Sequence, residues 1–193
     1  SDVYKRQASF GITALNELEQ LAHKKSLVED GSFALKTMEH INQMVEKFKE
    51  EDGRLYAIYG TPAENLCGLQ VQQFRKKHGV IENVSDRDYV SNSFHCHVSE
   101  EISPIEKQDK EKRFWDLCNG GKIQYVKYPI DYNMQAFKTL LKRAMRLGFY
   151  EGVNLSLSYC DDCGHEELNM DVCPKCGSCL LYTSPSPRDS TSS

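Results

Sequence analysis

The sequence predicts an α/β fold followed by a small cysteine-rich module. Segments with the short period of strands alternate with segments whose apolar residues recur every three to four positions, as in folds whose strands are joined by helical crossovers. The sequence shows no evident internal repeat. Near the C-terminal end, cysteines fall in two C-x-x-C pairs, a pattern typical of a metal site rather than of an α/β core.

Length and composition indicate one globular domain with a small appendage. The chain has 193 residues, of which 39% are hydrophobic and 27% charged, and its formal net charge is −4. Mild acidity argues against a large nucleic-acid face, which is normally basic. No run approaches the roughly 18 apolar residues of a membrane span, and the N-terminus has no signal-peptide core. We therefore expect a cytoplasmic protein with no membrane partner, whose eight cysteines are ligands and thiols rather than disulfides.

The first predicted elements are an amphipathic helix and a short strand. The helix covers Phe33–Lys49 and follows the start signals of residues 30–32. Its apolar residues recur at helical spacing: Ala34, Met38, Ile41, Val45 and Phe48. Leu55–Tyr59 is a short apolar strand.

The turn after this strand, T-P-A-E at residues 61–64, begins a second helix. Thr61 is expected at the N-cap, Pro62 at the first helical position and Glu64 at the third, which makes a capping box. The helix runs to about His78 and ends at Gly79. The unpaired N–H groups at a helix start favour anions, so the turn is either a phosphate-binding site or simply a well-capped helix.

Five further elements are expected. Ser93–Val98 alternates like a strand, with Phe94, Cys96 and Val98 on one face and Ser93, His95 and His97 on the other. A charged helix follows Pro104 and ends at Asn119-Gly120-Gly121, and Lys122–Lys127 is a strand. A helix over Tyr132–Leu147 turns Met134, Phe137, Leu141, Ala144 and Met145 inward, and an extended piece follows at Gly152–Ser158.

The two C-x-x-C pairs predict a closed zinc site. They read C-D-D-C-G at residues 160–164 and C-P-K-C-G at residues 173–177, so Cys160, Cys163, Cys173 and Cys176 can hold one tetrahedral Zn²⁺. Each C-x-x-C pair is expected to form a tight turn, called a knuckle, that is followed by a glycine. Gly164 and Gly177 can adopt the positive φ that such a turn needs. With four protein ligands this zinc is structural. A redox pair, a disulfide pair or an iron–sulfur cluster are the alternatives.

Other reactive residues have ordinary interpretations. His95 and His97 could bind a metal, but no third ligand is placed by spacing, so we expect solvent-facing or hydrogen-bonded histidines. Cys67, Cys96 and Cys118 are expected to be small buried hydrophobes, with a thiol-dependent site as the alternative. We expect the charge run Glu100–Arg113 to be a solvated face. Asn119-Gly120-Gly121 is expected to form a turn at the end of the helix, or a place where the glycines let a ligand approach the backbone.

Both ends of the chain look foreign to the rest. SDVYKRQ at residues 1–7 and LLYTSPSPRDSTSS at residues 180–193 resemble translated sequencing-adapter sequence. We expect residues 1–7 to be a non-native leader and residues 179–193, which include Cys179, a non-native and disordered tail. An ordinary flexible terminus is the alternative.

The order of motifs resembles one family. S-F-G-I-T-A-L-N-E (9–17), Y-G-T-P-A-E (59–64), N-S-F-H (92–95), N-G-G-K-I-Q-Y (119–125) and the two cysteine knuckles together resemble the anaerobic ribonucleoside-triphosphate reductases, the glycyl-radical class. The resemblance covers about residues 8–178. It implies the C-terminal part of a ten-stranded α/β barrel over residues 8–158 and a four-cysteine zinc-ribbon module over residues 159–178.

The resemblance also implies a chemistry. A stored glycyl radical oxidises a cysteine inside the barrel, and the thiyl radical abstracts the 3′-hydrogen of a ribonucleoside triphosphate so that the 2′-hydroxyl leaves as water. Formate or a small redox protein supplies electrons. A separate activase installs the radical with S-adenosylmethionine and an iron–sulfur cluster, the zinc module supports the radical loop, and the intact enzyme is a homodimer.

The chain departs from this pattern at the radical machinery. The radical glycine is expected in an R-x-C-G-Y-like loop after the second knuckle, where residues 180–193 stand instead. The thiyl cysteine lies upstream of Ser9 in the family, and Cys67, Cys96 and Cys118 match no such position. We therefore assign no catalytic residue and expect this fragment to be inactive. By analogy with related reductases, the backbone N–H groups of Thr61, Ala63 and Glu64 hold substrate phosphates, although the Glu64 carboxylate would repel one.

A zinc ribbon that recruits nucleic acid or protein is the alternative function. Ribbons that bind nucleic acid carry basic or aromatic hairpins, whereas residues 164–172 read GHEELNMDV, with three acidic residues and no Lys or Arg. This composition favours the reductase. A stand-alone regulator stabilised by its metal is a third possibility, which charge does not exclude.

Overall fold

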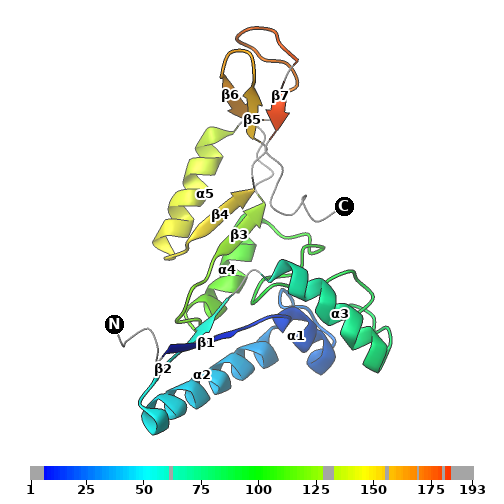
Figure 1. Cartoon of the computed structure of the whole chain (residues 1–193), viewed down its shortest axis with the longest axis vertical. Helices are drawn as coiled ribbons and strands as arrows, with labels where there is room; N and C mark the ends of the chain where they lie inside the picture. The colour runs from blue at the N-terminus through cyan, green and yellow to red at the C-terminus, as the bar shows by residue number, and fades with distance from the viewer. Residues whose placement is uncertain are drawn as a thin grey trace.

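The computed structural model of the chain describes residues 7–60, 63–127, 133–154, 157–168, 170–179 and 181–183. Within these ranges the chain forms five helices and seven strands, and Figure 1 shows a larger body with a small sheet at the far end from α2. The alternation of strands and helices predicted for the body is confirmed. No helix in the ranges described is long and apolar enough to cross a lipid bilayer. The expected leader and tail lie mostly outside these ranges.

The first parallel pair of strands is joined by two helices. Strand β1 (Gln7–Gly11) runs parallel to β2 (Leu55–Tyr59), in a register that places Phe10 beside Ile58. Helices α1 (Leu15–His23) and α2 (Ser32–Asp52) form the crossover, as parallel pairing requires. The predicted strand Leu55–Tyr59 is confirmed, whereas β1 and α1 were not predicted, and β1 begins at Gln7, the last residue of the expected leader.

Helix α2 follows the predicted periodicity and extends beyond it at both ends. Ala34, Met38 and Val45 are buried against the main core. Phe48, expected inward, is 37% exposed because it lies near the end of the helix, where its ring meets the Tyr56 ring edge to face at 6.2 Å between centroids.

Helix α3 (Glu64–His78) begins later than its capping box predicts. Ala63 occupies the N-cap and its carbonyl accepts the first helical bond, from the N–H of Cys67, at 2.9 Å. Thr61 and Pro62 lie outside the described residues. The predicted end at His78, capped by Gly79 with φ 78°, is confirmed.

The strand predicted at Ser93–Val98 is wrong. Ser93 has a φ of 50°, which an extended strand cannot contain, and the N–H of His95 bonds back to the carbonyl of Asn92 at 2.9 Å. The segment is therefore a turn followed by irregular chain. Residues 93–97 are all buried. Their polar and apolar side chains alternate, but neither set faces solvent.

A second parallel pair follows. Helix α4 (Pro104–Trp115), β3 (Gln124–Lys127), α5 (Met134–Arg146) and β4 (Glu151–Asn154) succeed one another, and β3 pairs with β4 in parallel. Helix α4 begins with a capping box between Ser103 and Glu106 and ends before the predicted Asn119. On α5, Ala144 is buried as expected, but Met134 and Met145 are 47% and 69% exposed, because the face that packs on β4 and α4 is narrower than the apolar stripe.

The Asn119-Gly120-Gly121 segment attaches to the end of β2. The N–H of Ile58 donates to the Asn119 side-chain oxygen at 2.8 Å, and the N–H of Gly120 donates to the carbonyl of Ile58 at 2.7 Å. A Cβ on Gly120 would lie 2.9 Å from that carbonyl oxygen. The glycine therefore lets another segment of backbone approach, which links the first strand pair to the second.

The C-terminal module is a small antiparallel sheet. Its strands are β5 (Leu157–Cys160), β6 (Glu166–Leu168) and β7 (Leu181–Thr183), in the order β6-β5-β7. The predicted extended piece at Gly152–Ser158 is thus divided between β4 and β5. The expectation of a wholly disordered tail is wrong for residues 181–183, because they pair with β5.

Candidate metal centre

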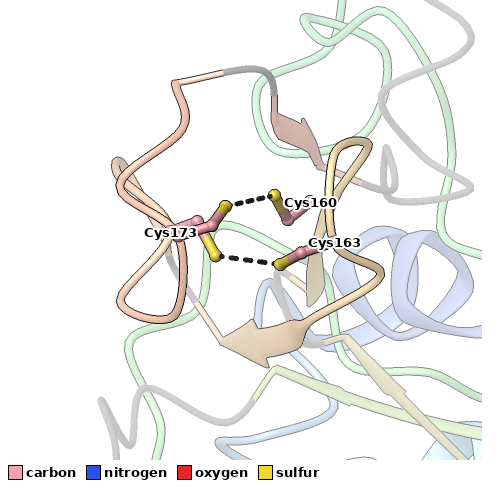
Figure 2. A group of neighbouring side chains, drawn as sticks. Cys160, Cys163 and Cys173 are labelled. Carbon is pink, nitrogen blue, oxygen red and sulfur yellow. Dashed lines mark hydrogen bonds between the residues drawn. The ribbon is translucent and has the colours of Figure 1, made fainter.

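Four cysteine sulfurs converge at the tip of the C-terminal module. Cys160 ends β5 and Cys163 follows in the turn to β6, while Cys173 and Cys176 come from a second turn. All four Sγ atoms lie within 4.8 Å of one another. Figure 2 shows the two turns facing each other. The Sγ–Sγ distance is 3.5 Å for Cys160–Cys176 and 3.5 Å for Cys163–Cys173.

The two turns have the same backbone geometry. The N–H of Gly164 donates to the carbonyl of Cys160 at 2.9 Å, and the N–H of Gly177 donates to the carbonyl of Cys173 at 2.8 Å. Gly164 and Gly177 have φ values of 68° and 73°, in the left-handed region that favours glycine. The conformational role predicted for these two glycines is confirmed.

The sulfur positions fit a tetrahedral metal ion. With metal–sulfur bonds of about 2.3 Å, a tetrahedron of thiolates has edges of about 3.8 Å. The shortest distances of 3.5 Å and the upper limit of 4.8 Å bracket this edge. Four protein ligands leave no position for substrate, so such a centre stabilises structure and does not itself catalyse.

The electrostatics of the cluster favour a cation. Burial acts to raise the pKa of Cys173, but the backbone N–H groups of Cys176 and Lys175 outweigh it and lower that pKa to about 6. At Cys176 the backbone of Ser178 favours the thiolate, but hydrogen bonds with the other three thiols prevail and raise the pKa to about 12. Four neighbouring thiols cannot all ionise alone, and a bound cation removes this conflict.

The predicted histidines are buried rather than solvent-facing. His95 and His97 are 3% and 8% exposed. His95 Nδ1 lies 3.1 Å from a carboxylate oxygen of Glu111, and His97 Nδ1 lies 2.8 Å from the hydroxyl of Ser99. The hydrogen-bonded alternative is therefore correct, and the two rings do not meet in a metal site among the residues described.

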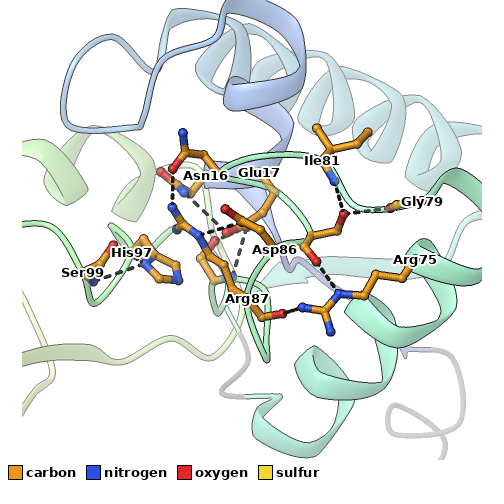
Figure 3. A network of polar contacts seen from close by, with 12 residues as sticks. Asn16, Glu17, Arg75, Gly79, Ile81, Asp86, Arg87, His97 and Ser99 are labelled. Carbon is orange, nitrogen blue, oxygen red and sulfur yellow. Dashed lines mark hydrogen bonds and ion pairs between the residues drawn. The ribbon is translucent and has the colours of Figure 1, made fainter.

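The segment near His97 is fixed by Arg75. Figure 3 shows the Arg75 guanidinium donating to the backbone carbonyls of Ser85 and Arg87, while Arg87 lies beside Asp86 at 3.6 Å. Burial lowers the pKa of His97 to about 4. The nearby positive charge of Arg87 lowers this pKa further, whereas the negative charge of Asp86 acts to raise it. His97 is thus neutral at pH 7.

Glu111 contradicts the prediction of a solvated charge run. Its side chain is fully buried, accepts from the N–H of Cys96 at 2.8 Å and pairs with Lys107 and His95. Burial acts to raise its pKa, but Lys107 and His95 outweigh that and lower it to about 2. The other charged residues of the run are exposed or partly exposed, as predicted.

The other predicted thiols are buried. Cys67, Cys96 and Cys118 are at most 4% exposed, and the thiol of Cys67 donates to the side-chain oxygen of Asn92 at 2.9 Å. Burial raises the pKa of Cys96 to about 12 and that of Cys118 to about 11. Low thiolate content and burial make Cys96 and Cys118 unreactive, and Cys67 is buried as well.

A cavity of about 660 Å³ was not predicted. It lies between the first turns of α3 and residues 88–98, and its lining includes Cys67, Tyr89, His95 and His97. No sequence signal marks it, because the irregular path of residues 88–98 creates it. A second cluster, Glu19, His23 and Asp30, also lies within 4.8 Å, but Glu19 is already used to accept from the N–H of Ala34 at the start of α2.

The fold and the site together define an α/β protein that carries a four-cysteine metal-binding module. A family model described as anaerobic ribonucleoside-triphosphate reductase matches residues 2–183. The chain therefore belongs to the anaerobic ribonucleoside-triphosphate reductase family, which confirms the resemblance drawn from the ordered motifs.

Individual relatives agree with the family model. The anaerobic ribonucleoside-triphosphate reductase of Haemophilus influenzae is 32% identical over 179 residues, which cover 88% of this chain and 25% of the relative. The Escherichia coli protein of the same name is 35% identical over 146 residues, which cover 72% of this chain and 20% of the relative. The chain thus spans a quarter or less of the length of these two relatives.

Solved structures share the fold. The anaerobic ribonucleotide reductase of Thermotoga maritima with glycerol in its active site matches with a TM-score of 0.69 at 19% identity, over 92% of this chain and 31% of that one. Another anaerobic ribonucleotide reductase matches with a TM-score of 0.72 at 20% identity, over 93% of this chain and 29% of that one.

Proposed function

We propose that this chain is a C-terminal part of an anaerobic ribonucleoside-triphosphate reductase, an oxidoreductase that converts ribonucleoside triphosphates to 2′-deoxyribonucleoside triphosphates for DNA synthesis. The match of the family model over residues 2–183 carries this proposal. A Thermotoga maritima relative of the same fold is described in complex with dATP and CTP, which supports nucleotides as ligands. The acidic hairpin of the module gives no support to the alternative of a nucleic-acid-binding ribbon.

The proposed chemistry is divided between this chain and the rest of the enzyme. Residues 8–158 would contribute late strands and helices of the ten-stranded barrel. The glycyl radical, the thiyl cysteine and the nucleotide-sensing domain would belong to other parts of the intact homodimer. An S-adenosylmethionine-dependent iron–sulfur activase would install the radical, and formate or a small redox protein would supply electrons, all in the cytoplasm.

Cys160, Cys163, Cys173 and Cys176 would hold Zn²⁺. An all-sulfur donor set with tetrahedral spacing suits this ion. The zinc would join the two turns, and it would hold the following chain in register with the barrel. The residues of this chain supply positioning rather than a reacting group.

The start of α3 remains the proposed phosphate site. The backbone N–H groups of Ala63 and Glu64 stand at the N-terminus of a helix of fifteen residues, where the helix dipole favours an anion. Thr61 is proposed as a third donor, from outside the described residues.

The decisive test is an anaerobic assay of the intact enzyme that contains this chain. With activase, S-adenosylmethionine, formate or a reduced redox protein, and a ribonucleoside triphosphate, deoxynucleotide should form at many times the rate seen without activase. Absence of product and of any glycyl radical signal in a folded, activase-treated enzyme would contradict the proposed function.

A further inference from the structure

The four cysteines of the module form two pairs that differ in access. In the pair Cys160–Cys176 the first residue is buried and the second exposed, and in the pair Cys163–Cys173 the first residue is half-buried and the second buried. Each pair therefore couples a more exposed cysteine to a buried one. Both pairs connect one knuckle to the other (Figure 2).

We propose that this cluster is also an oxidation site, at which hydrogen peroxide forms the disulfides Cys160–Cys176 and Cys163–Cys173 and releases the metal. The release rests on the proposed zinc centre, whereas the pairing rests on the sulfur geometry alone. A disulfide bond is about 2.05 Å long, so each pair must close by about 1.5 Å from its 3.5 Å separation.

The reaction balances in two steps for each pair. The sulfur of the more exposed cysteine, which is a thiolate when the cluster holds the proposed metal, attacks hydrogen peroxide, which breaks the O–O bond and yields a sulfenic acid and hydroxide. The buried thiolate then attacks the sulfenic sulfur, forms the S–S bond and displaces a second hydroxide. Two thiolates lose two electrons, one peroxide gains them, and a cluster of four consumes two peroxides.

Other thiols in the described part of the chain are poor competitors. Cys67, Cys96 and Cys118 are buried in the body of the protein. Cys179 is exposed and lies three residues after Cys176, but it is not among the four converging sulfurs. The cross-knuckle pairing also keeps the two turns joined after the metal has left, which pairing within each knuckle would not do.

The test is a peroxide titration of the 193-residue chain, with zinc measured before and during oxidation. Trypsin cuts after Lys175 and endoproteinase Asp-N cuts before Asp161, Asp162 and Asp171, so the four ligands fall on separate peptides for mass spectrometry. We expect one zinc released for every two peroxides, the Cys160–Cys176 and Cys163–Cys173 disulfides, and recovery of zinc binding after dithiothreitol and Zn²⁺.

The Cys179→Ser variant is the matched control and should give the same release and the same two disulfides. Bonds within a knuckle, a bond to Cys179, or sulfinic and sulfonic acids without disulfides would overturn the inference. A chain that contains no zinc before oxidation would contradict the proposed metal centre instead, and the disulfide map of that chain would still decide the pairing.

Discussion

At the scale of single residues, the metal centre depends on backbone groups as much as on sulfurs. Each knuckle ends in a glycine with positive φ, and a backbone hydrogen bond closes each turn. Because the thiolates are held by two separate turns, loss of one ligand should open a tetrahedral site that has no spare donor among the described residues.

Cys173→Ser should therefore lose the zinc, whereas Cys179→Ser should retain it. The unmodified chain is expected to bind one zinc, with Zn–S distances near 2.3 Å by X-ray absorption. Elemental analysis of the purified proteins measures the stoichiometry. Iron in place of zinc, or a metal content that Cys173→Ser leaves unchanged, would contradict the assignment.

Two adjacent glycines offer a second test at the residue scale. A Cβ on Gly120 would lie 2.9 Å from the carbonyl oxygen of Ile58, whereas a Cβ on Gly121 would meet no described atom within 4 Å. Gly120→Ala should lower the free energy of unfolding by about 1–3 kcal/mol through overpacking, and Gly121→Ala should change it by less than about 0.5 kcal/mol. Equal effects in urea denaturation would refute the close approach.

At the scale of elements, α4 is attached to residues 95–96 through one buried carboxylate. Glu111→Ala removes the acceptor that Lys107, His95 and the N–H of Cys96 share. Breaking such a pair should cost about 3–5 kcal/mol, while the exposed Glu39→Ala should cost little. Because the pKa of Glu111 is lowered to about 2, its contribution is present above pH 4.5 and is lost as pH falls towards 2. A thermal or urea midpoint unchanged in Glu111→Ala would show that the network does not stabilise the fold.

His97 should make the stability of the segment beside α3 depend on pH. Its folded pKa of about 4 is below the ordinary 6.5, so between these values the unfolded state binds the extra proton and stability falls as pH falls. The loss from pH 7.5 to pH 4.5 should be about 2–3 kcal/mol. His97→Gln should remove it and the exposed His40→Gln should not, as judged by urea unfolding at each pH.

The elements that the sequence predicts well are those whose periodicity is apolar. Helix α2 follows the spacing of Ala34, Met38 and Val45, and β2 matches a continuous apolar run. Helix α1 was missed because its buried face is largely polar: the buried residues of this helix are Leu15, Asn16, Glu17, Glu19 and Gln20. Their partners come from distant segments, such as Ser91, whose N–H and hydroxyl donate to Glu17.

The convergence of the four cysteines could be predicted because their spacing is local. Each knuckle places two sulfurs within four residues, and one contact between two such turns completes the site. The burial of Glu111 and the cavity beside α3 could not be predicted, because both depend on the irregular path of residues 88–98. A turn at Ser93, with its positive φ, has no sequence signal comparable to a glycine.

At the scale of the whole molecule, the described body contains two parallel strand pairs, which a single parallel bridge between Gly60 and Lys122 joins. Such pairs are marginal alone, and in the proposed enzyme further strands would extend them into the barrel. Their open edges are an aggregation hazard in the isolated chain.

The 193-residue chain by itself should form no deoxynucleotide, even with activase, S-adenosylmethionine and formate. Abstraction of a ribose hydrogen needs a thiyl radical and a stable radical store, and the thiols of the described residues are buried or gathered in the metal cluster, apart from Cys179 at the surface. Preorganised geometry contributes about 7–11 kcal/mol in such sites. Product above background in an anaerobic assay would show that the catalytic residues have been misplaced.

The most direct test of the proposed role is electron paramagnetic resonance of the intact enzyme after activation. The unmodified enzyme should accumulate a glycyl radical, whereas Cys160→Ser should remain folded by circular dichroism, lose its zinc and accumulate no radical, because the zinc module holds the radical loop in position. The proposed role of the module is to hold the radical loop in position, and a normal glycyl radical signal in the zinc-free variant would contradict it.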